Sequence, residues 1–390
     1  ALSGELRVVQ GILPMALQTT RQERTLVIAP DNAAEATLVK NVRVITGKHL
    51  LTLTAHLSGT ERLDYCAPVP VTRAAHTQPD LQDVRGQYQA RRALEIAAAG
   101  GHSLLMLGPP GTGKSLLASR LPGILPEMTE DEALEAAALA SISQQPVHAG
   151  RWKQRAFRAP HHTASAVSLV GGGSSPRPGE ISLAHHGVLF LDELPEFDRK
   201  VLEVLREPLE SGHIMISRAA RQATFPAAFQ LIAAMNPCPC GYLGDPSGRC
   251  HCTSEQVKRY RNRISGPLLD RIDMHVEVPR LTFSEIEGQP GEHSSVVRKR
   301  VCRTRERQLE RNGTLNSRLT HSQLQQACVL AKQDRQLLQH AMDKLQLSAR
   351  AYHRIIKLAR TIADMDAATG ITTGHLTEAI NYRRLDRSAV

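Results

Sequence analysis

The sequence is poor in aromatic residues, which make up 3% of its 390 positions and include a single tryptophan. Its hydrophobic core must therefore be built mainly from Leu, Ile, Val and Ala. It also has no apolar run near the roughly 20 residues that a membrane-spanning helix needs. No charged leader followed by an apolar segment opens it, so secretion is not indicated. We expect a cytoplasmic protein without a membrane partner.

Acidic residues are outnumbered, with 38 Asp and Glu against 48 Lys and Arg and a net charge of +10. This balance favours a polyanionic partner such as nucleic acid, although a basic surface without such a partner is equally compatible with composition. Cysteine is sparse as well, with seven residues, but four of them cluster. In a cytosolic protein such a cluster suggests a bound metal before disulfides.

A glycine-rich stretch stands at residues 108–115, between an apolar run at 103–107 and a second at 116–118. Strand, glycine turn and helix start, in that order, are the context of a phosphate-binding loop, in which backbone N–H groups and the helix dipole face the anion. We expect Lys114 to reach the β- and γ-phosphates of ATP and Ser115 to bind Mg²⁺. The predicted nucleotide ligands are Gly108, Pro109, Pro110, Gly111, Thr112, Gly113, Lys114, Ser115 and Leu116.

Two further apolar runs end in polar side chains suited to phosphate chemistry. Residues 187–191 end in Asp192 and Glu193. A buried parallel strand would deliver both acids at its carboxyl end, Asp192 to hold Mg²⁺ and Glu193 to orient and deprotonate the attacking water. Residues 229–235 end in Asn236, whose amide can contact the γ-phosphate and the water.

The cysteine cluster consists of Cys238, Cys240, Cys250 and Cys252. Four thiolates folded back by a Gly- and Pro-rich turn can enclose a structural Zn²⁺, with His251 as a possible substitute for one ligand. The C-x-C spacing is less common than C-x₂-C, so four free or redox-active thiols remain an alternative.

Histidine pairs and a basic turn supply further candidates. His161/His162 and His185/His186 invite a metal interpretation, but adjacent side chains seldom face one ion, so contacts to loops or substrate are favoured. Residues 208–226 have hairpin character with a basic turn. The predicted DNA contacts are His161, His162, Arg218 and Arg221.

The order of motifs predicts an α/β fold with four parts: a small α/β unit (1–57), a polar linker (58–82), an ATPase core with a parallel sheet (83–280) that carries a zinc-binding insertion at 238–252, and an all-helical lid (281–390). The first part resembles the second half of a Lon-protease-like domain. Met15 occupies the position of that family's catalytic lysine, and the half with the nucleophilic serine is missing. A thioether cannot deprotonate a hydroxyl, so no peptidase activity is expected.

The segments at 159–165, 187–193, 236–241 and 265–273 together resemble the ComM/YifB family of magnesium-chelatase-like AAA+ ATPases. The resemblance extends into the lid at 347–364 and covers essentially the whole chain. It implies a homohexameric ring motor that acts on single-stranded and branched DNA, in branch migration during natural transformation, and that can meet other recombination proteins. It assigns Arg271 to the γ-phosphate held by the neighbouring subunit. It carries over Lys114, Ser115, Asp192, Glu193, Asn236, Arg271 and, as a "sensor 2" arginine closing onto the nucleotide, Arg350, with Val84 and Gly86 where relatives line the adenine pocket.

Two other classes of motor are compatible with an ATPase core. A chelatase motor would drive metal insertion into a tetrapyrrole, but the four-cysteine insertion and the excess of arginine argue against it. A Lon-like protease or protein-remodelling factor is disfavoured by Met15 and the missing serine half.

Overall fold

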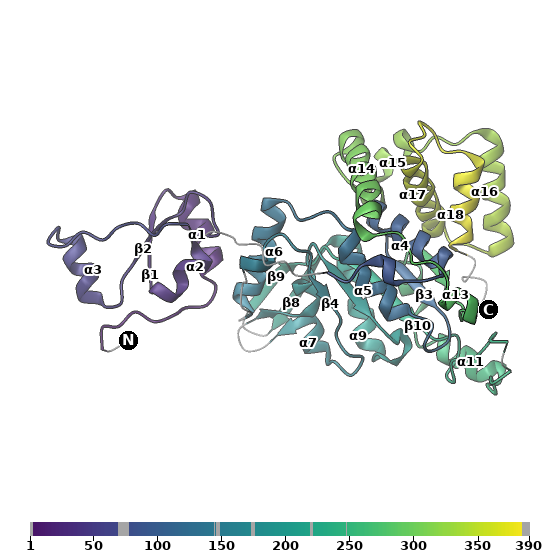
Figure 1. The fold of residues 1–390 in the computed structure, drawn as a ribbon, viewed down its shortest axis with the longest axis horizontal. Helices are drawn as coiled ribbons and strands as arrows, with labels where there is room; N and C mark the ends of the chain where they lie inside the picture. The colour runs from purple at the N-terminus through teal and green to yellow at the C-terminus, as the bar shows by residue number, and fades with distance from the viewer. Residues whose placement is uncertain are drawn as a thin grey trace.

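The computed structural model describes residues 3–68, 78–143, 145, 149–172, 176–218, 221–246 and 248–383, with only the backbone of 217, 218 and 221. Figure 1 shows a small N-terminal unit beside a larger body that the C-terminal helices cap. Within the described residues, no helix combines the length and the apolar character needed to span a bilayer.

The N-terminal unit is built on two parallel strands, β1 (Thr25–Ile28) and β2 (Arg43–Thr46). Helices α1 (Ile12–Arg21), α2 (Ala33–Ala36) and α3 (Leu50–Leu57) and the short 3₁₀ turn η1 (Pro30–Asn32) accompany them. Its small core includes Ala137 of α6 (Glu130–Ile142), which joins this unit to the larger body. Met15, for which the sequence predicts the position of a Lon-like catalytic lysine, is about half exposed on α1.

A five-stranded parallel sheet organises the larger body, in the order β11–β3–β10–β7–β4. Because all five strands run the same way, their carboxyl ends meet at one edge of the sheet, which is where ligands bind in such folds. The strands are β3 (Leu104–Leu107), β4 (Phe157–Arg158), β7 (Val188–Leu191), β10 (Gln230–Met235) and β11 (Met274–Glu277).

Both faces of this sheet are buried, as expected for a parallel sheet with continuous apolar strands. Successive residues of β3 alternate between two hydrophobic clusters: Leu104 and Met106 face one, Leu105 and Leu107 the other. Helices α4 (Tyr88–Gly100), α5 (Lys114–Ile124) and α14 (Ser294–Asn312) cover the first face. The second is covered by η4 (Leu194–Glu196), α8 (Glu180–Leu183), α9 (Arg199–Val204), α11 (Ser254–Arg261) and α12 (Gly266–Leu269).

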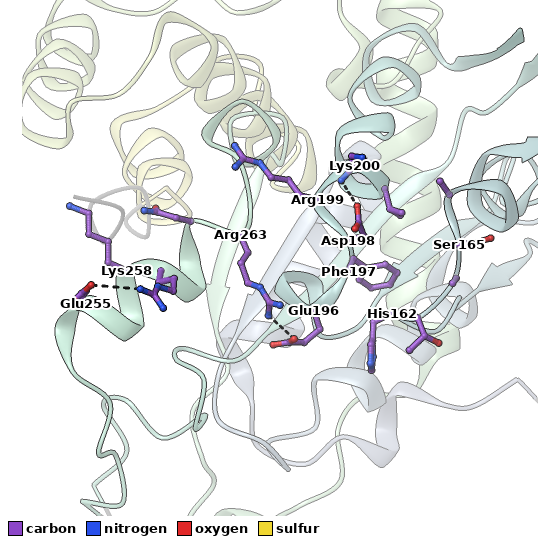
Figure 2. A pocket seen from close by; sticks show the side chains of 16 residues that line it. His162, Ser165, Glu196, Phe197, Asp198, Arg199, Lys200, Glu255, Lys258 and Arg263 are labelled. Carbon is purple, nitrogen blue, oxygen red and sulfur yellow. Dashed lines mark hydrogen bonds and ion pairs between the residues drawn. The ribbon is translucent and has the colours of Figure 1, made fainter.

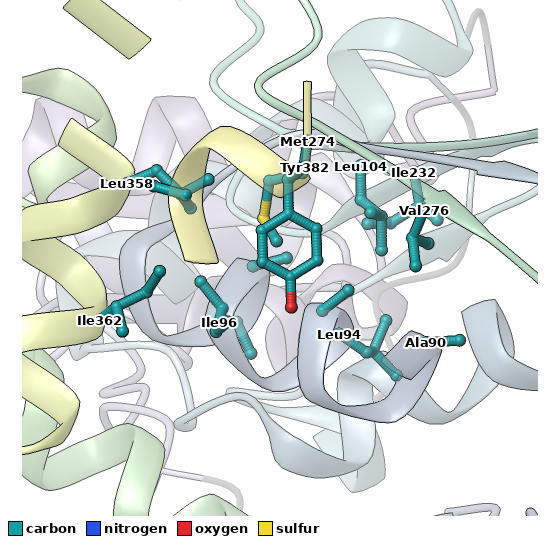
Figure 3. Close-up of a cluster of buried hydrophobic side chains, with 14 of the residues drawn as sticks. Ala90, Leu94, Ile96, Leu104, Ile232, Met274, Val276, Leu358, Ile362 and Tyr382 are labelled. Atoms are coloured by element: carbon teal, nitrogen blue, oxygen red, sulfur yellow. The ribbon is translucent and has the colours of Figure 1, made fainter. Parts of the chain in front are cut away.

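The C-terminal helices share the hydrophobic core of the first face. Leu358 and Ile362 of α17 and Tyr382 lie against Ile96 of α4 and Met274 of β11 in one cluster (Figure 3). Helix α17 begins at Ala349 because the Ser348 hydroxyl accepts a hydrogen bond from the Ala351 amide. The lid helices are α15 (His321–Ala327), α16 (Lys332–Leu345), α17 (Ala349–Met365) and α18 (Thr373–Asn381).

The remaining elements are short. An antiparallel hairpin of β8 (His213–Arg218) and β9 (Arg221–Pro226) follows α10 (Arg206–Ser211). The others are α7 (Ala166–Val170), α13 (Phe283–Ile286), β5 (Gly171–Gly172), β6 (Arg177–Pro178), η2 (Leu81–Asp83), η3 (Ala149–Arg151) and η5 (Asn316–Arg318).

Candidate nucleotide-binding site

The glycine-rich loop lies between the carboxyl ends of β10 and β11. The Gly108 amide donates to the Met235 carbonyl at 3.2 Å. A Cβ at Gly108 would lie 2.1 Å from the Val278 carbonyl oxygen, so only glycine fits. Gly111 and Gly113 have φ of 75° and 90°, values that other residues rarely adopt. The loop thus exposes backbone N–H groups at the start of α5, an arrangement that can bind a phosphate.

Lys114 is buried at the first position of α5. Its Nζ donates to the carbonyl oxygens of Gly108 at 2.7 Å and Pro109 at 2.8 Å, and to Oδ1 of Asn236 at 3.2 Å. Burial lowers the pKa of Lys114, and the charges of Asp192 and Glu193 oppose that shift. Lys114 and Asn236, 122 residues apart in sequence, therefore meet at one point of the loop.

The acidic pair lies next to the loop. Ser115 Oγ donates to Oδ2 of Asp192 at 2.5 Å, and Asp192 Oδ1 accepts the Glu193 amide at 2.9 Å. Glu193 has a φ of 51°, in the left-handed region that L-residues rarely adopt. A hydroxyl and a carboxylate in direct contact beside a phosphate loop are the ligands that Mg²⁺ uses in such sites, so Ser115 and Asp192 fit that ion.

The segment before α4 is also tied to the loop. The Gln87 side-chain amide donates to the carbonyl oxygens of Thr112 at 3.2 Å and Pro279 at 2.7 Å. Val84 is buried, and Gly86 has a φ of 58°, where an added Cβ would lie 2.8 Å from Cδ2 of Leu281. The predicted adenine-pocket residues thus lie on a segment hydrogen-bonded to the loop.

Arg271 and Arg350 lie elsewhere, at the amino edge of the sheet. The Arg271 carbonyl accepts a hydrogen bond from Ser103, the residue before β3. Arg350, from the first turn of α17, reaches the same place, because Oε1 of Glu210 lies 2.8 Å from Arg271 and 3.7 Å from Arg350. The length of β3, about 3.3 Å per residue, separates this edge from the phosphate loop of the same chain.

The four clustered cysteines converge as predicted for a metal site. Sγ of Cys238 lies 3.3 Å from that of Cys240 and 3.8 Å from that of Cys250, and the Cys240–Cys250 separation is 3.7 Å. Sulfur atoms on a tetrahedral Zn²⁺ with bonds of about 2.3 Å would be about 3.8 Å apart. The Sγ atom of Cys252 belongs to the same group. The donor set therefore fits a structural Zn²⁺, and His251 is not needed to complete it.

His162 lines a groove next to the acidic pair. Its Nδ1 lies 3.3 Å from Oε2 of Glu193, and its ring meets the edge of Phe197. His161 is bonded instead to Thr163 at 2.8 Å. Figure 2 shows His162 and Phe197 on one side of the groove and Lys258 and Arg263 on the other. The groove has a volume of about 1110 Å³ and its basic lining residues are Arg199, Lys200, Lys258, Arg259 and Arg263.

The other predicted DNA contacts lie on the β8–β9 hairpin. Arg218 and Arg221 pair across its end. Their side chains are outside the part of the chain that the structure describes, so their contact with DNA stays a prediction.

The second histidine pair does face a common group, the carboxylate of Glu135. Nε2 of His185 lies 3.1 Å and Nε2 of His186 2.8 Å from its Oε2. The Ala228 amide donates to Nδ1 of His185, which uses the one lone pair of a neutral imidazole. Nε2 of His185 therefore carries a hydrogen and cannot also bind a metal. Burial lowers the pKa of His185 to about 4.

Comparison with known proteins identifies this arrangement. The family model "Magnesium chelatase, subunit ChlI" matches residues 80–286, and its C-terminal counterpart matches residues 291–383. Competence protein ComM of Haemophilus influenzae is 49% identical over 99% of this chain and 77% of its own length. The chain belongs to the ComM/YifB family. Membership in this magnesium-chelatase-like AAA+ family implies ATP and Mg²⁺ as ligands and confirms the α/β fold with a helical C-terminal region.

Other ComM/YifB proteins and a chelatase subunit are also similar. YifB of Escherichia coli is 47% identical over 99% of this chain and 76% of its own length. The magnesium-chelatase 38 kDa subunit of Rhodobacter capsulatus is 26% identical over 43% of this chain and 53% of its own length. The ComM/YifB similarity therefore spans the N-terminal unit as well, whereas the similarity to this chelatase subunit covers less than half of the chain.

Two contacts of the site could not be predicted from the sequence. Glu210 is one of two acids on a short helix, and its contact with Arg271 arises only when segments about 60 residues apart meet. The contact between His162 and Glu193 likewise depends on two strands, β4 and β7, lying side by side.

Proposed function

We propose that this protein is the subunit of an ATP-driven, homohexameric DNA motor that promotes branch migration of recombination intermediates during natural transformation. The observation that carries the proposal is the separation of the two halves of an ATPase site. Lys114, Asp192 and Glu193 lie at the carboxyl edge of the sheet, and Arg271 lies at the amino edge. Two copies side by side would bring both halves together.

At such a junction each side chain has a distinct task. The backbone of residues 108–113 and Lys114 bind the triphosphate, and Glu193 accepts the proton of the attacking water. Ser115 and Asp192 would hold Mg²⁺, which would supply positive charge beside the phosphate oxygens. Arg271 of the adjacent copy stabilises the charge that develops in the transition state, a contribution of about 10³–10⁵ in rate in known cases. Arg350, beside Arg271, would reach the same neighbouring nucleotide rather than that of its own chain.

The charge of the chain and its similarity to a competence protein support DNA as the substrate on which the proposed motor acts. The chain carries a net charge of +10, and the groove with five basic lining residues also includes His162, whose ring contacts Glu193. The relative from Haemophilus influenzae is named a competence protein. Recombination proteins are the partners that this role implies.

ATP hydrolysis in the presence of different DNA structures tests the proposal. We expect forked or four-way DNA to stimulate hydrolysis and Lys114→Ala to abolish it, with the released phosphate as the measured product. Movement of a labelled four-way junction, dependent on ATP, would support branch migration directly. A rate of ATP hydrolysis that is the same without DNA and with every DNA structure would contradict the DNA role.

A chelatase-type motor subunit is the second candidate, favoured by the match to the ChlI family model. It predicts ATP hydrolysis that responds to a tetrapyrrole-binding partner subunit and is indifferent to DNA. The same hydrolysis assay therefore separates the two candidates, and a third alternative, a protein-remodelling factor, predicts stimulation by an unfolded polypeptide.

A further inference from the structure

Three charged side chains from distant parts of the chain meet at the amino edge of the sheet. Glu210 comes from α10, Arg271 precedes β11, and Arg350 belongs to the first turn of α17. Oε1 of Glu210 lies 2.8 Å from Nη2 of Arg271 and 3.7 Å from Nη2 of Arg350. All three line one cavity of about 490 Å³. A single carboxylate oxygen thus connects both arginines.

Arg271 depends on this carboxylate because its own side chain is only 6% exposed. Its Nη1 donates to the Pro267 carbonyl at 2.8 Å, four residues earlier, and its buried Nε has no acceptor among the described atoms. A buried guanidinium without a carboxylate partner is costly and adopts other positions to reach water. Glu210 is therefore the group that holds the charged end of Arg271 in one place.

The rest of the cavity does not offer a substitute. Its other acid, Asp273, accepts hydrogen bonds from the amide and the hydroxyl of Ser103 and is paired with Arg354. The further charged residues that line the cavity are basic: Arg318, Arg354 and Lys357. Loss of Glu210 would leave Arg271 among positive charges that repel it.

We propose that Glu210 is a positioning residue that fixes the Arg271 guanidinium where it meets the triphosphate bound by a second copy of this chain. The inference rests on the proposed function, because it requires ATP to be cleaved between adjacent copies. Glu210 touches no reacting atom and acts through Arg271. Since an arginine of this kind acts only in the transition state, loss of its support lowers kcat and leaves nucleotide binding nearly intact.

Kinetics of ATP hydrolysis by Glu210→Ala test the first part of the proposal. A misplacement of about 1 Å can cost about 100-fold in rate, so we expect kcat to fall about 100-fold while KM changes little. Glu210→Gln keeps an oxygen that can accept from Arg271 and should lose less. Glu207→Ala, at an exposed acid of the same helix, is the matched control and should hydrolyse ATP normally. A kcat for Glu210→Ala equal to or above that of the wild type would overturn the proposal.

Mixed assemblies test whether the defect acts across the junction. Glu210→Ala subunits keep an intact phosphate loop, and Lys114→Ala subunits keep an intact Glu210–Arg271 pair. Neither variant should hydrolyse ATP well alone, but a mixture should regain activity at junctions that combine the two intact halves. A simple folding defect in Glu210→Ala would not be rescued in this way.

A reference mixture of Arg271→Ala with Lys114→Ala separates the possible failures. If this mixture regains activity and the Glu210→Ala mixture does not, the role of Glu210 is wrong and the proposed function stands. If neither mixture regains activity, ATP is not cleaved between copies, and both proposals fall.

Discussion

Replacement of Cys240 by serine is expected to prevent zinc binding at the four-cysteine cluster and to weaken nucleotide binding. The Sγ separations of 3.3, 3.7 and 3.8 Å are close to the sulfur–sulfur distance of about 3.8 Å expected for a tetrahedral zinc–thiolate site. A hydroxyl is a much poorer zinc ligand than a thiolate at neutral pH. Metal content should fall from one zinc per chain to well below one.

The effect on the nucleotide follows from the position of the cluster. Gly241 has a φ of 85°, and a Cβ there would lie 2.7 Å from Cδ of Pro110 in the phosphate loop. On the other side, Asn236 bonds Lys114 two residues before the first cysteine. A hydrogen bond to a charged group contributes about 1.5–3 kcal/mol. If the distorted loop loses about 1.4 kcal/mol of its binding free energy for the nucleotide, ADP binds about tenfold more weakly.

Metal analysis by mass spectrometry and titration with a fluorescent ADP analogue measure both effects. Cys302→Ser, which changes a cysteine of α14 outside the cluster, is the control and should retain both zinc and affinity. Wild-type protein with well under one zinc per chain would refute the metal assignment. Cys240→Ser protein that has lost zinc and still binds ADP normally would refute the coupling to the phosphate loop.

Two further predictions concern stability. The pKa of His185 lies near 4 in the folded protein and about 6.5 in the unfolded chain, so its contribution is complete above pH 6.5 and is lost as the pH falls toward 4. The free energy of unfolding, measured with urea, should therefore decrease by about 1 kcal/mol from pH 7.5 to 5.5. His185→Asn, whose amide oxygen can accept a hydrogen bond from the Ala228 amide, should lack this decrease. The same pH dependence in both proteins would contradict the assignment. Asp364 is buried and accepts hydrogen bonds from Arg311, Arg360 and Asn316. Asp364→Ala should therefore lower the free energy of unfolding by about 3–5 kcal/mol, whereas Asp343→Ala, at an exposed acid, should unfold like the wild type. A decrease of less than 1 kcal/mol for Asp364→Ala would contradict this prediction.

The phosphate loop and the acidic pair were predictable because each depends on local order in the chain. Residues 103–118 specify strand, turn and helix by themselves, and the apolar run before Asp192 specifies a buried strand. Parallel strands bring their carboxyl ends to one edge of the sheet. The parallel arrangement alone therefore predicts that Lys114, Asp192 and Asn236 lie close together. The cysteine cluster is similarly local.

The position of Arg350 could not be read from the sequence in the same way. Its place depends on how α17 packs against α4, which is decided by the hydrophobic cluster that includes Leu358 and Ile362. That packing sets Arg350 beside Arg271, with Glu210 between them. Contacts among residues so far apart in the chain follow from tertiary packing, which no local pattern encodes.

The central claim is that ATP is cleaved between adjacent copies of this chain. A structure of the assembled protein with a non-hydrolysable ATP analogue tests it most directly, through the distance from the Arg271 guanidinium to the nearest γ-phosphate. The account predicts hydrogen-bond distance to the nucleotide held by Lys114 of the neighbouring copy. An Arg271 side chain remote from every triphosphate in the assembly would contradict it.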